Sequence, residues 1–145
     1  MHTVADLLKS KPAGLVSVEA GVSVRSAAAL MNEKRIGAVV VTDGGAVRGI
    51  LTERDILTRI VAPSRDPDRT AVLDVMTPDP LTCRPETRLS EARQVMRDKR
   101  IRHLPVVEQG RAVGMISIGD LNLAEHDALE ATILSMQAYI AGDTM

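Results

Sequence analysis

The sequence repeats itself after 65 residues, and this duplication limits the folds that the chain can adopt. The stretch from Gly49 to Ile56 returns as Gly114 to Leu121. Each copy has a glycine, two aliphatic residues, a hydroxyl residue, two variable residues, an aspartate and another aliphatic residue. An apolar run followed by a hydroxyl and, three positions later, an acid is typical of a strand that leads into a capped helix. The chain therefore contains two copies of one strand–helix junction.

The similarity extends well beyond this junction, without a gap from position 16 to position 57. Several of the matched positions are not core positions, so shared apolar patterning does not explain them, and they indicate a duplicated unit. Each unit is too small to bury its own sheet face, but two units packed together around a two-fold axis would do so. The identical pairs are Ala27/Ala92, Met31/Met96, Lys34/Lys99, Arg35/Arg100, Ile36/Ile101, Val41/Val106, Gly45/Gly110, Gly49/Gly114 and Asp55/Asp120.

Hydrophobic periodicity predicts the same order of elements in both units: a short strand, a helix, a strand, a return strand and a second helix. Ser23 is placed to cap the amphipathic helix of the first unit. In the first unit these elements are predicted at 16–18, 22–33, 36–42, 47–51 and 54–61. In the second unit they are predicted at 81–83, 89–98, 101–107 and 113–116, followed by the second copy of the motif helix.

We divide the chain into a first repeat at 1–62, a linker at 63–71, a second repeat at 72–123 and a C-terminal helix at 124–145. The linker is charged and proline-rich. The C-terminal stretch has Leu129, Ile133, Met136 and Ile140 at steps of four, three and four, the seam of a helix that packs on another helix. It either folds back on its own repeats or binds a partner chain.

Composition excludes several classes of protein. With no Phe or Trp and one Tyr, the core must be aliphatic. A net charge of −1 with dispersed basic residues disfavours nucleic-acid binding. The lone Cys83 forms no internal disulfide and matches Val18 in the repeat, which favours a small core residue, while His2 and His126 form no metal cluster. Neither a membrane-spanning run nor a signal peptide is present, so we expect a cytoplasmic protein without membrane contact.

The duplicated junction has two interpretations. In the first, Thr52 and Ser117 are helix caps and Asp55 and Asp120 complete the capping boxes, with no ligand involved. In the second, the free N–H groups at the helix start also suit a phosphate, and the neighbouring carboxylate accepts the two hydroxyls of a ribose. The basic pairs at 34–35 and 99–100 have a similar pair of interpretations, since they either complement a helix dipole or reach a phosphate.

Both hydroxyl-x-x-aspartate motifs resemble those of CBS domains, the cystathionine-beta-synthase type, which occur as tandem pairs called Bateman modules. The resemblance covers the chain from Val4 to about Leu123. It implies an α/β (α+β) fold of two β-α-β-β-α repeats packed with pseudo-two-fold symmetry, here followed by the C-terminal helix. It also implies two clefts between the repeats that take adenosine-containing ligands such as AMP, ATP, NAD(H) or S-adenosylmethionine.

Carried over to this chain, the resemblance assigns roles to residues of both repeats. Asp55 and Asp120 would bind ribose hydroxyls, and Thr52 and Ser117 would face phosphate. One cleft would combine Asp120 with Ser17, Ile36, Gly37 and the adjoining Ala38. The other would combine Asp55 with Thr82 and Ile101, and the two isoleucines would flank adenine. Further phosphate contacts are expected from Arg54, Arg102 and His103, although His103 as a surface or partly buried hydrogen-bonding residue is an equal alternative. Because Gly37-Ala38 stands where the second repeat has Arg102-His103, the two clefts should differ in affinity.

The resemblance thus implies a non-catalytic regulatory module that binds an adenine nucleotide, needs no catalytic cofactor and signals to an unidentified protein partner. Because the family commonly forms dimers, it also implies a homodimer to which the C-terminal helix contributes. The sequence has no recognisable nucleophile–base pair, no phosphate-binding glycine loop and no dinucleotide-binding motif, so nothing in it indicates an enzyme. The rival is a structural interaction module with empty clefts. A small hydrolase acting on a nucleotide is a third possibility.

Overall fold

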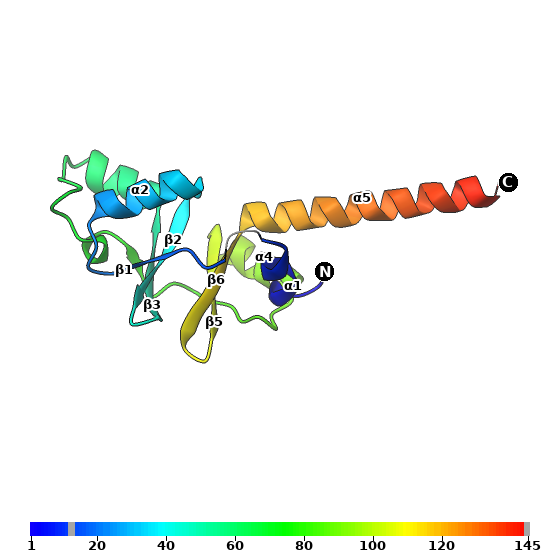
Figure 1. The fold of residues 1–145 in the computed structure, drawn as a ribbon, viewed down its shortest axis with the longest axis horizontal. Coiled ribbons are helices and arrows are strands. Elements are labelled where there is room, and N and C mark those ends of the chain that lie inside the picture. Colours follow the sequence, from blue (N-terminus) through cyan, green and yellow to red (C-terminus); the bar gives the residue numbers. More distant parts are fainter. Residues whose placement is uncertain (12–13, 144–145) are drawn as a thin grey trace.

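The computed structural model describes residues 1–11 and 14–143 (Figure 1). These residues form a mixed α/β fold with two similar halves and a C-terminal helix, which confirms the predicted fold class. Residues 144 and 145 of the predicted C-terminal helix lie outside the described residues. The elements are α1 (Val4–Ser10), β1 (Ser17–Glu19), α2 (Val24–Lys34), β2 (Ala38–Asp43), β3 (Ala46–Thr52), α3 (Glu53–Ile56), the π-helical turn η1 (Leu57–Val61), the 3₁₀ turn η2 (Val72–Asp74), β4 (Thr77–Pro78), α4 (Leu89–Lys99), β5 (His103–Glu108), β6 (Arg111–Ser117) and α5 (Ile118–Asp143).

The first half has the element order that periodicity predicts. Strand β1 runs parallel to β2, and β2 pairs antiparallel with β3 across a turn with Gly44 and Gly45 at positive φ. Ser23 caps α2, because its hydroxyl accepts the Ser26 N–H at 3.1 Å. The helix ends at Arg35 in the left-handed conformation, as α4 ends at Arg100. Both helix ends therefore repeat the same backbone turn.

The second half departs from the prediction at its first strand. The segment 81–83 does not form a strand, and a single parallel bridge joins Cys83 to Val106. This bridge matches the Val18–Val41 pair of the first half. Pro80 and Pro85 flank the segment and have no N–H group to extend a ladder, which gives a physical reason for the shortening. The chain instead forms β4, which was not predicted and pairs antiparallel with β3.

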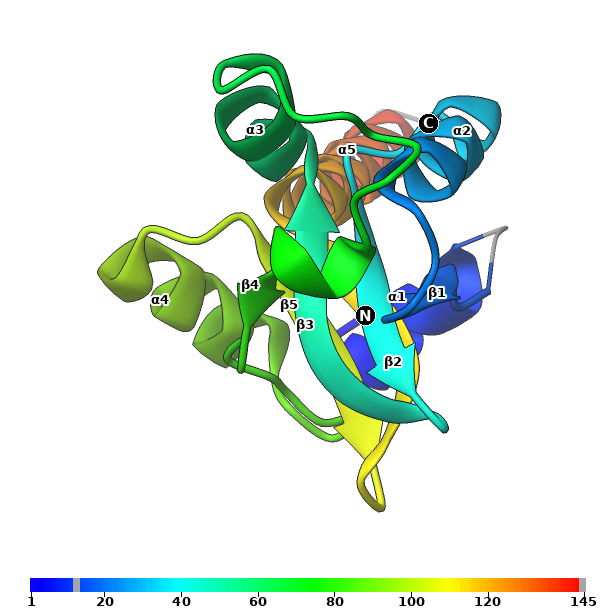
Figure 2. The same ribbon diagram turned by 90° about the vertical axis from the view of Figure 1, so that its left-hand side faces the viewer.

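The two halves share one sheet, with the strand order β1-β2-β3-β6-β5 and β4 beside β3 (Figure 2). The halves meet where β3 and β6 begin. Ala46 pairs with Arg111, and the Ala112 N–H donates to the Gly45 carbonyl at 3.0 Å. This short contact leaves the two motif junctions, at the far ends of β3 and β6, on the same side of the molecule.

Each half has its own aliphatic core, and the segment before each repeat's first strand packs into the other half's core. Helix α1 contributes Val4 and Leu7 to the core of the second half. Turn η2 and the residues after it contribute Val72 and Val75 to the core of the first half. The two halves are therefore interlocked by an exchange of their leading segments.

This exchange explains one pair of repeated glycines. A Cβ on Gly49 would lie 2.6 Å from the Met76 sulfur and 2.6 Å from the Thr77 carbonyl oxygen. A Cβ on Gly114 would lie 2.8 Å from Leu8 Cδ2. Both glycines thus leave room on the last strand of a repeat for the exchanged segment.

Cys83 lies in the second core, as its match to Val18 predicts. Burial raises the pKa of its thiol to about 11, so it is a protonated, apolar core residue at neutral pH.

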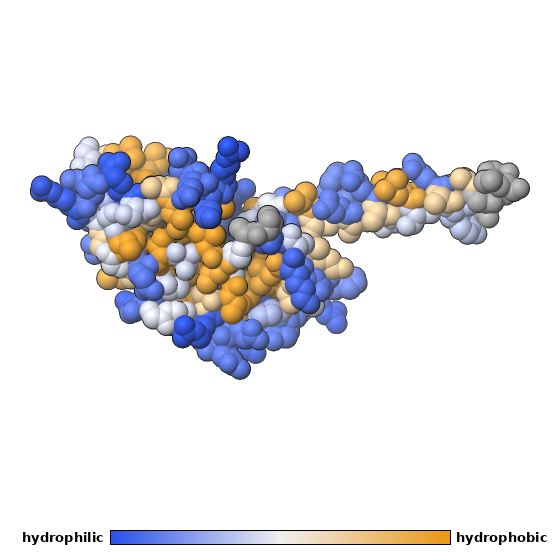
Figure 3. Space-filling model, in the orientation of Figure 1, coloured by the Kyte–Doolittle hydropathy of each residue, from blue (hydrophilic) through white to orange (hydrophobic). Residues whose placement is uncertain are grey.

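Helix α5 starts at the second motif junction and continues without a break for 26 residues. Its first turns pack on the second half through Leu121 and through an ion pair of 2.9 Å between Arg93 and Glu125. The rest projects away from the sheet as a single helix (Figure 1). Apolar side chains lie along this projecting part (Figure 3): Leu129, Ile133, Leu134, Met136, Tyr139 and Ile140 are all exposed.

Candidate functional site

Both motif junctions form complete capping boxes. The Thr52 hydroxyl accepts the Asp55 N–H at 3.1 Å while Asp55 Oδ2 accepts the Thr52 N–H at 3.0 Å. At the second junction the Ser117 hydroxyl accepts the Asp120 N–H at 3.0 Å, and Asp120 Oδ2 accepts the Ser117 N–H at 2.9 Å. Capping therefore uses one oxygen of each carboxylate. The other oxygen, Oδ1, decides whether the junction can bind anything else.

Asp120 lies in a cavity of about 300 Å³ at the junction between the two halves. The cavity is built from the start of β2, the start of β5, the end of β6 and the residues Lys11, Gly14 and Val16 that lie between α1 and β1 in the chain. It brings together six residues that the sequence predicts as site residues: Ile36, Gly37, Ala38, His103, Ser117 and Asp120. Its other lining residues are Lys11, Gly14, Val16, Arg35, Met115 and Ile116.

Lys11 is the polar residue of this cavity that motif analysis missed. Its ammonium donates to Asp120 Oδ2 at 2.8 Å and to the Met115 carbonyl at 2.8 Å. The side chains of Lys11 and Asp120 are 30% and 24% exposed, so the pair lies in the cavity wall and not in the core. Within the described chain, no donor forms a hydrogen bond with Asp120 Oδ1. This oxygen can accept hydrogen bonds from a ligand.

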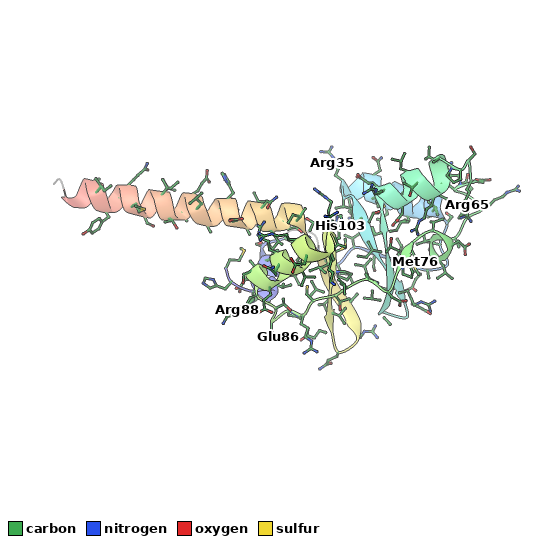
Figure 4. The ribbon with its side chains drawn as sticks, turned by 180° about the vertical axis from the view of Figure 1, so that it is seen from behind. Arg35, Arg65, Met76, Glu86, Arg88 and His103 are labelled. Atoms are coloured by element: carbon green, nitrogen blue, oxygen red, sulfur yellow. The ribbon has the colours of Figure 1, made fainter. Side chains whose placement is uncertain are left out.

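Among the residues that line the cavity, positive groups outnumber negative ones, and the Glu53 carboxylate lies just outside the lining, near Gly37. Lys11 and Arg35 are cationic and Asp120 is the carboxylate of the wall. Burial, and next the neighbouring Arg102, lower the pKa of His103 below its ordinary value of 6.5, so its imidazole is neutral at pH 7. Figure 4 shows Arg35 and His103 at the junction of the two halves. The cavity suits an anion with hydroxyl groups.

The first junction is closed. Asp55 is 6% exposed, and the Thr77 hydroxyl lies 3.2 Å from its Oδ1 and 3.4 Å from its Oδ2. Thr77 belongs to β4, which lies against β3 at Gly49. A protein hydroxyl thus occupies the carboxylate oxygen that a ribose would need.

The remaining predicted residues lie elsewhere. Ser17 is on β1 beside Val16, and Arg54 is exposed on α3. Thr82 lines a different cavity, near the turn at Gly110. Ile101 and Arg102 line a groove between α4 and α5 with Arg93, Met96, Arg97, Arg100 and Ile118. The structure therefore places Thr82 and Ile101 neither in the Asp120 cavity nor among the hydrogen-bond partners of Asp55.

Across residues 1–11 and 14–143, no group of three or more His, Cys, Asp or Glu side chains could hold a metal ion. Over the same residues, no helix has the length and apolar character needed to cross a membrane.

Comparison with known proteins places this architecture in a family. The family model for the CBS domain matches twice, at residues 4–62 and 72–127. The chain is 36% identical to the mitochondrial CBS domain-containing protein CBSX3 of Arabidopsis thaliana, over 97% of this chain and 72% of that protein.

Solved structures agree with this match. A signal-transduction protein with CBS domains from Burkholderia ambifaria superposes with a TM-score of 0.78 at 39% identity, over 84% of this chain and 92% of that one. The CBS domain protein PAE2072 from Pyrobaculum aerophilum, complexed with AMP, superposes with a TM-score of 0.73 at 29% identity, over 81% and 88% of the two chains. The present chain belongs to the CBS domain proteins and carries two CBS domains in tandem.

Proposed function

We propose that the protein is a regulatory module that binds an adenosine-containing nucleotide in the Asp120 cavity. The observation that carries this proposal is a cavity lined by both repeats in which a capped helix start presents an accessible carboxylate oxygen. A nucleotide bound there would contact both halves at once. Its occupancy could then change how the halves are held together.

The chemistry of the cavity fits the parts of such a ligand. An ionised carboxylate accepts hydrogen bonds from both hydroxyls of a ribose, and Asp120 Oδ1 is open to them. Val16 and Ile36 offer aliphatic surface to an adenine ring. Lys11 and Arg35 supply positive charge for phosphate. The AMP complex of the Pyrobaculum relative supports an adenine nucleotide as the ligand class. AMP, ATP and NAD(H) are the candidates.

The response to the ligand would be transmitted without catalysis. We propose that the chain forms a homodimer to which α5 contributes, and that it acts on an unidentified protein partner in the cytoplasm. The exposed apolar residues of α5 support a binding role for this helix. The names of the relatives refer to CBS domains and signal transduction, which supports a regulatory protein and not an enzyme.

Equilibrium titration tests this function. AMP, ATP, NAD and NADH are titrated by calorimetry into the wild-type chain and into the Asp55→Ala/Asp120→Ala double variant. We expect saturable binding of at least one nucleotide to the wild type and a loss of about tenfold or more in the double variant, since a hydrogen bond to a charged group contributes about 1.5–3 kcal/mol. Unchanged binding in the double variant would exclude the assigned site.

A structural interaction module without nucleotide is the second candidate, and the projecting α5 favours it. On this account the capping boxes only stabilise helices. Asp120→Ala would then cost about 0.5–2 kcal/mol of folding stability and change no binding. The same titration separates the two functions.

A further inference from the structure

We infer that Lys11 is the residue that selects phosphate-bearing nucleotides over neutral nucleosides in the Asp120 cavity. This inference rests on the proposed function of that cavity. The Lys11 ammonium occupies the side of the carboxylate that faces the Met115 carbonyl, with both contacts at 2.8 Å.

The Lys11 ammonium and a bound ribose would compete for the same carboxylate, that of Asp120. Asp120 Oδ2 already accepts the Ser117 N–H, and the Lys11 ammonium adds a charged donor to the same oxygen. Oδ1 stays open, so a ribose that uses only this oxygen shares the carboxylate with the ammonium, whereas a ribose that uses both oxygens must displace it. A neutral nucleoside offers the displaced ammonium no new partner, so it would bind at the expense of a partly buried ion pair.

A phosphate changes this balance. A phosphate group that enters the same cavity gives the Lys11 ammonium an anionic partner within the cavity wall. The Lys11 side chain is flexible and about one third exposed, so the ammonium can move while α1 stays packed. Charge-assisted contacts to phosphate replace the contact to Asp120, and the carboxylate is released for the ribose. Lys11 therefore acts on the ribose and the phosphate at the same time.

The first repeat provides an internal comparison. The group that contacts Asp55 comes from the corresponding connecting segment, but it is the neutral hydroxyl of Thr77. A hydroxyl donates to the carboxylate in the same way but cannot compensate a phosphate charge. The two junctions thus differ in the group of the exchanged segment that contacts the carboxylate, a cation at Asp120 and a neutral hydroxyl at Asp55.

The test compares adenosine with AMP. Both are titrated into the wild type, Lys11→Met and Lys11→Arg, and into Lys9→Met as a matched control that removes the same charge from an exposed position of α1. In the wild type we expect AMP to bind about tenfold or more tightly than adenosine. In Lys11→Met adenosine should bind more tightly and AMP less tightly, so that this ratio falls towards one. Lys11→Arg and Lys9→Met should keep the ratio of the wild type.

The outcomes distinguish this inference from the proposed function. If AMP and adenosine bind and their ratio is the same in Lys11→Met as in Lys9→Met, the role of Lys11 is wrong and the nucleotide site stands. If AMP does not bind the folded wild type, and ATP, NAD and NADH do not bind it in the titration of the proposed function, that function and the role of Lys11 both fail. Circular dichroism of each variant shows whether the chain remains folded.

Discussion

The two motif junctions have the same sequence pattern, the same capping box and the same place at the end of a strand, yet only one of them is open. Asp55 is buried beneath Thr77, whereas Asp120 faces a cavity of about 300 Å³ and an ammonium group. The difference does not come from the motifs. It comes from the residues that cover the two aspartates, Thr77 of β4 at the first junction and Lys11 after α1 at the second. A capped aspartate is therefore a binding group only where its cover leaves an oxygen accessible.

The largest expected effect is on ligand affinity. Asp120→Ala should weaken nucleotide binding by about tenfold or more, because it removes the acceptor of the ribose hydroxyls. Asp55→Ala should weaken binding less and lower folding stability more, because it leaves Thr77 and the Thr52 N–H without their acceptor. Calorimetric titration and urea unfolding of both variants measure these effects. The reverse order of affinities would mean that the first junction is the ligand site.

The next effect is on folding stability, where the covering segments pack closely against Gly49 and Gly114. Gly49→Ala should lower the free energy of unfolding by about 1–3 kcal/mol, since the new methyl group meets the Thr77 carbonyl, a backbone atom that cannot turn away. Gly114→Ala should cost less, because the methyl group meets only the end of the flexible Leu8 side chain. Urea unfolding of the two matched variants gives the comparison. Equal losses would show that β4 is no more rigidly placed than α1.

Thr77→Val tests the closed first junction by removing one hydrogen bond without adding volume. Valine has nearly the same shape as threonine but lacks the hydroxyl that donates to Asp55. We expect a loss of about 1 kcal/mol in unfolding free energy, the usual contribution of one hydrogen bond. Thermal and urea unfolding measure it, with Thr82→Val, at another exposed threonine outside the helices and strands, as a control. No loss relative to that control would indicate that the Thr77 contact does not hold the first junction closed.

The smallest effect is a pH dependence at the second junction. Burial lowers the pKa of His103, with Arg102 and Lys11 lowering it and Asp120 and Glu53 raising it. The unfolded chain therefore takes up this proton first as the pH falls. The stability due to neutral His103 is complete above pH 6.5 and is lost as the pH falls below that value. The first repeat has an alanine, Ala38, at the position of His103, so alanine is the natural replacement. Because His103→Ala removes the titrating imidazole, it should flatten the fall in unfolding free energy between pH 7 and about pH 5. A fall as steep as that of the wild type would assign the pH dependence to other groups.

Most of the fold could be predicted from the sequence, because the duplication gives two independent readings of the same element order. The repeated pattern located both hairpins, both amphipathic helices and both capping boxes, and the family resemblance brought Ile36, Gly37 and Asp120 into one site. The prediction failed where proline removes ladder hydrogen bonds, so that 81–83 keeps only the bridge at Cys83.

The covers of the two junctions could not be predicted in the same way. Lys11 meets Asp120 across 109 residues of sequence, and Thr77 meets Asp55 across 22. No periodicity or spacing links such pairs, because they depend on the exchange of α1 and η2 between the two cores. The repeated Gly49 and Gly114 are the one trace of these covers in the sequence. Their meaning as points of close approach became clear only with Met76 and Leu8 in place.

A crystal structure of the wild-type chain with AMP tests the central claim most directly. The account predicts the ribose hydroxyls within hydrogen-bonding distance of Asp120, the phosphate beside the displaced Lys11 ammonium, and Thr77 still in contact with Asp55. AMP bound at Asp55 with β4 moved aside, or bound away from both junctions, would contradict it.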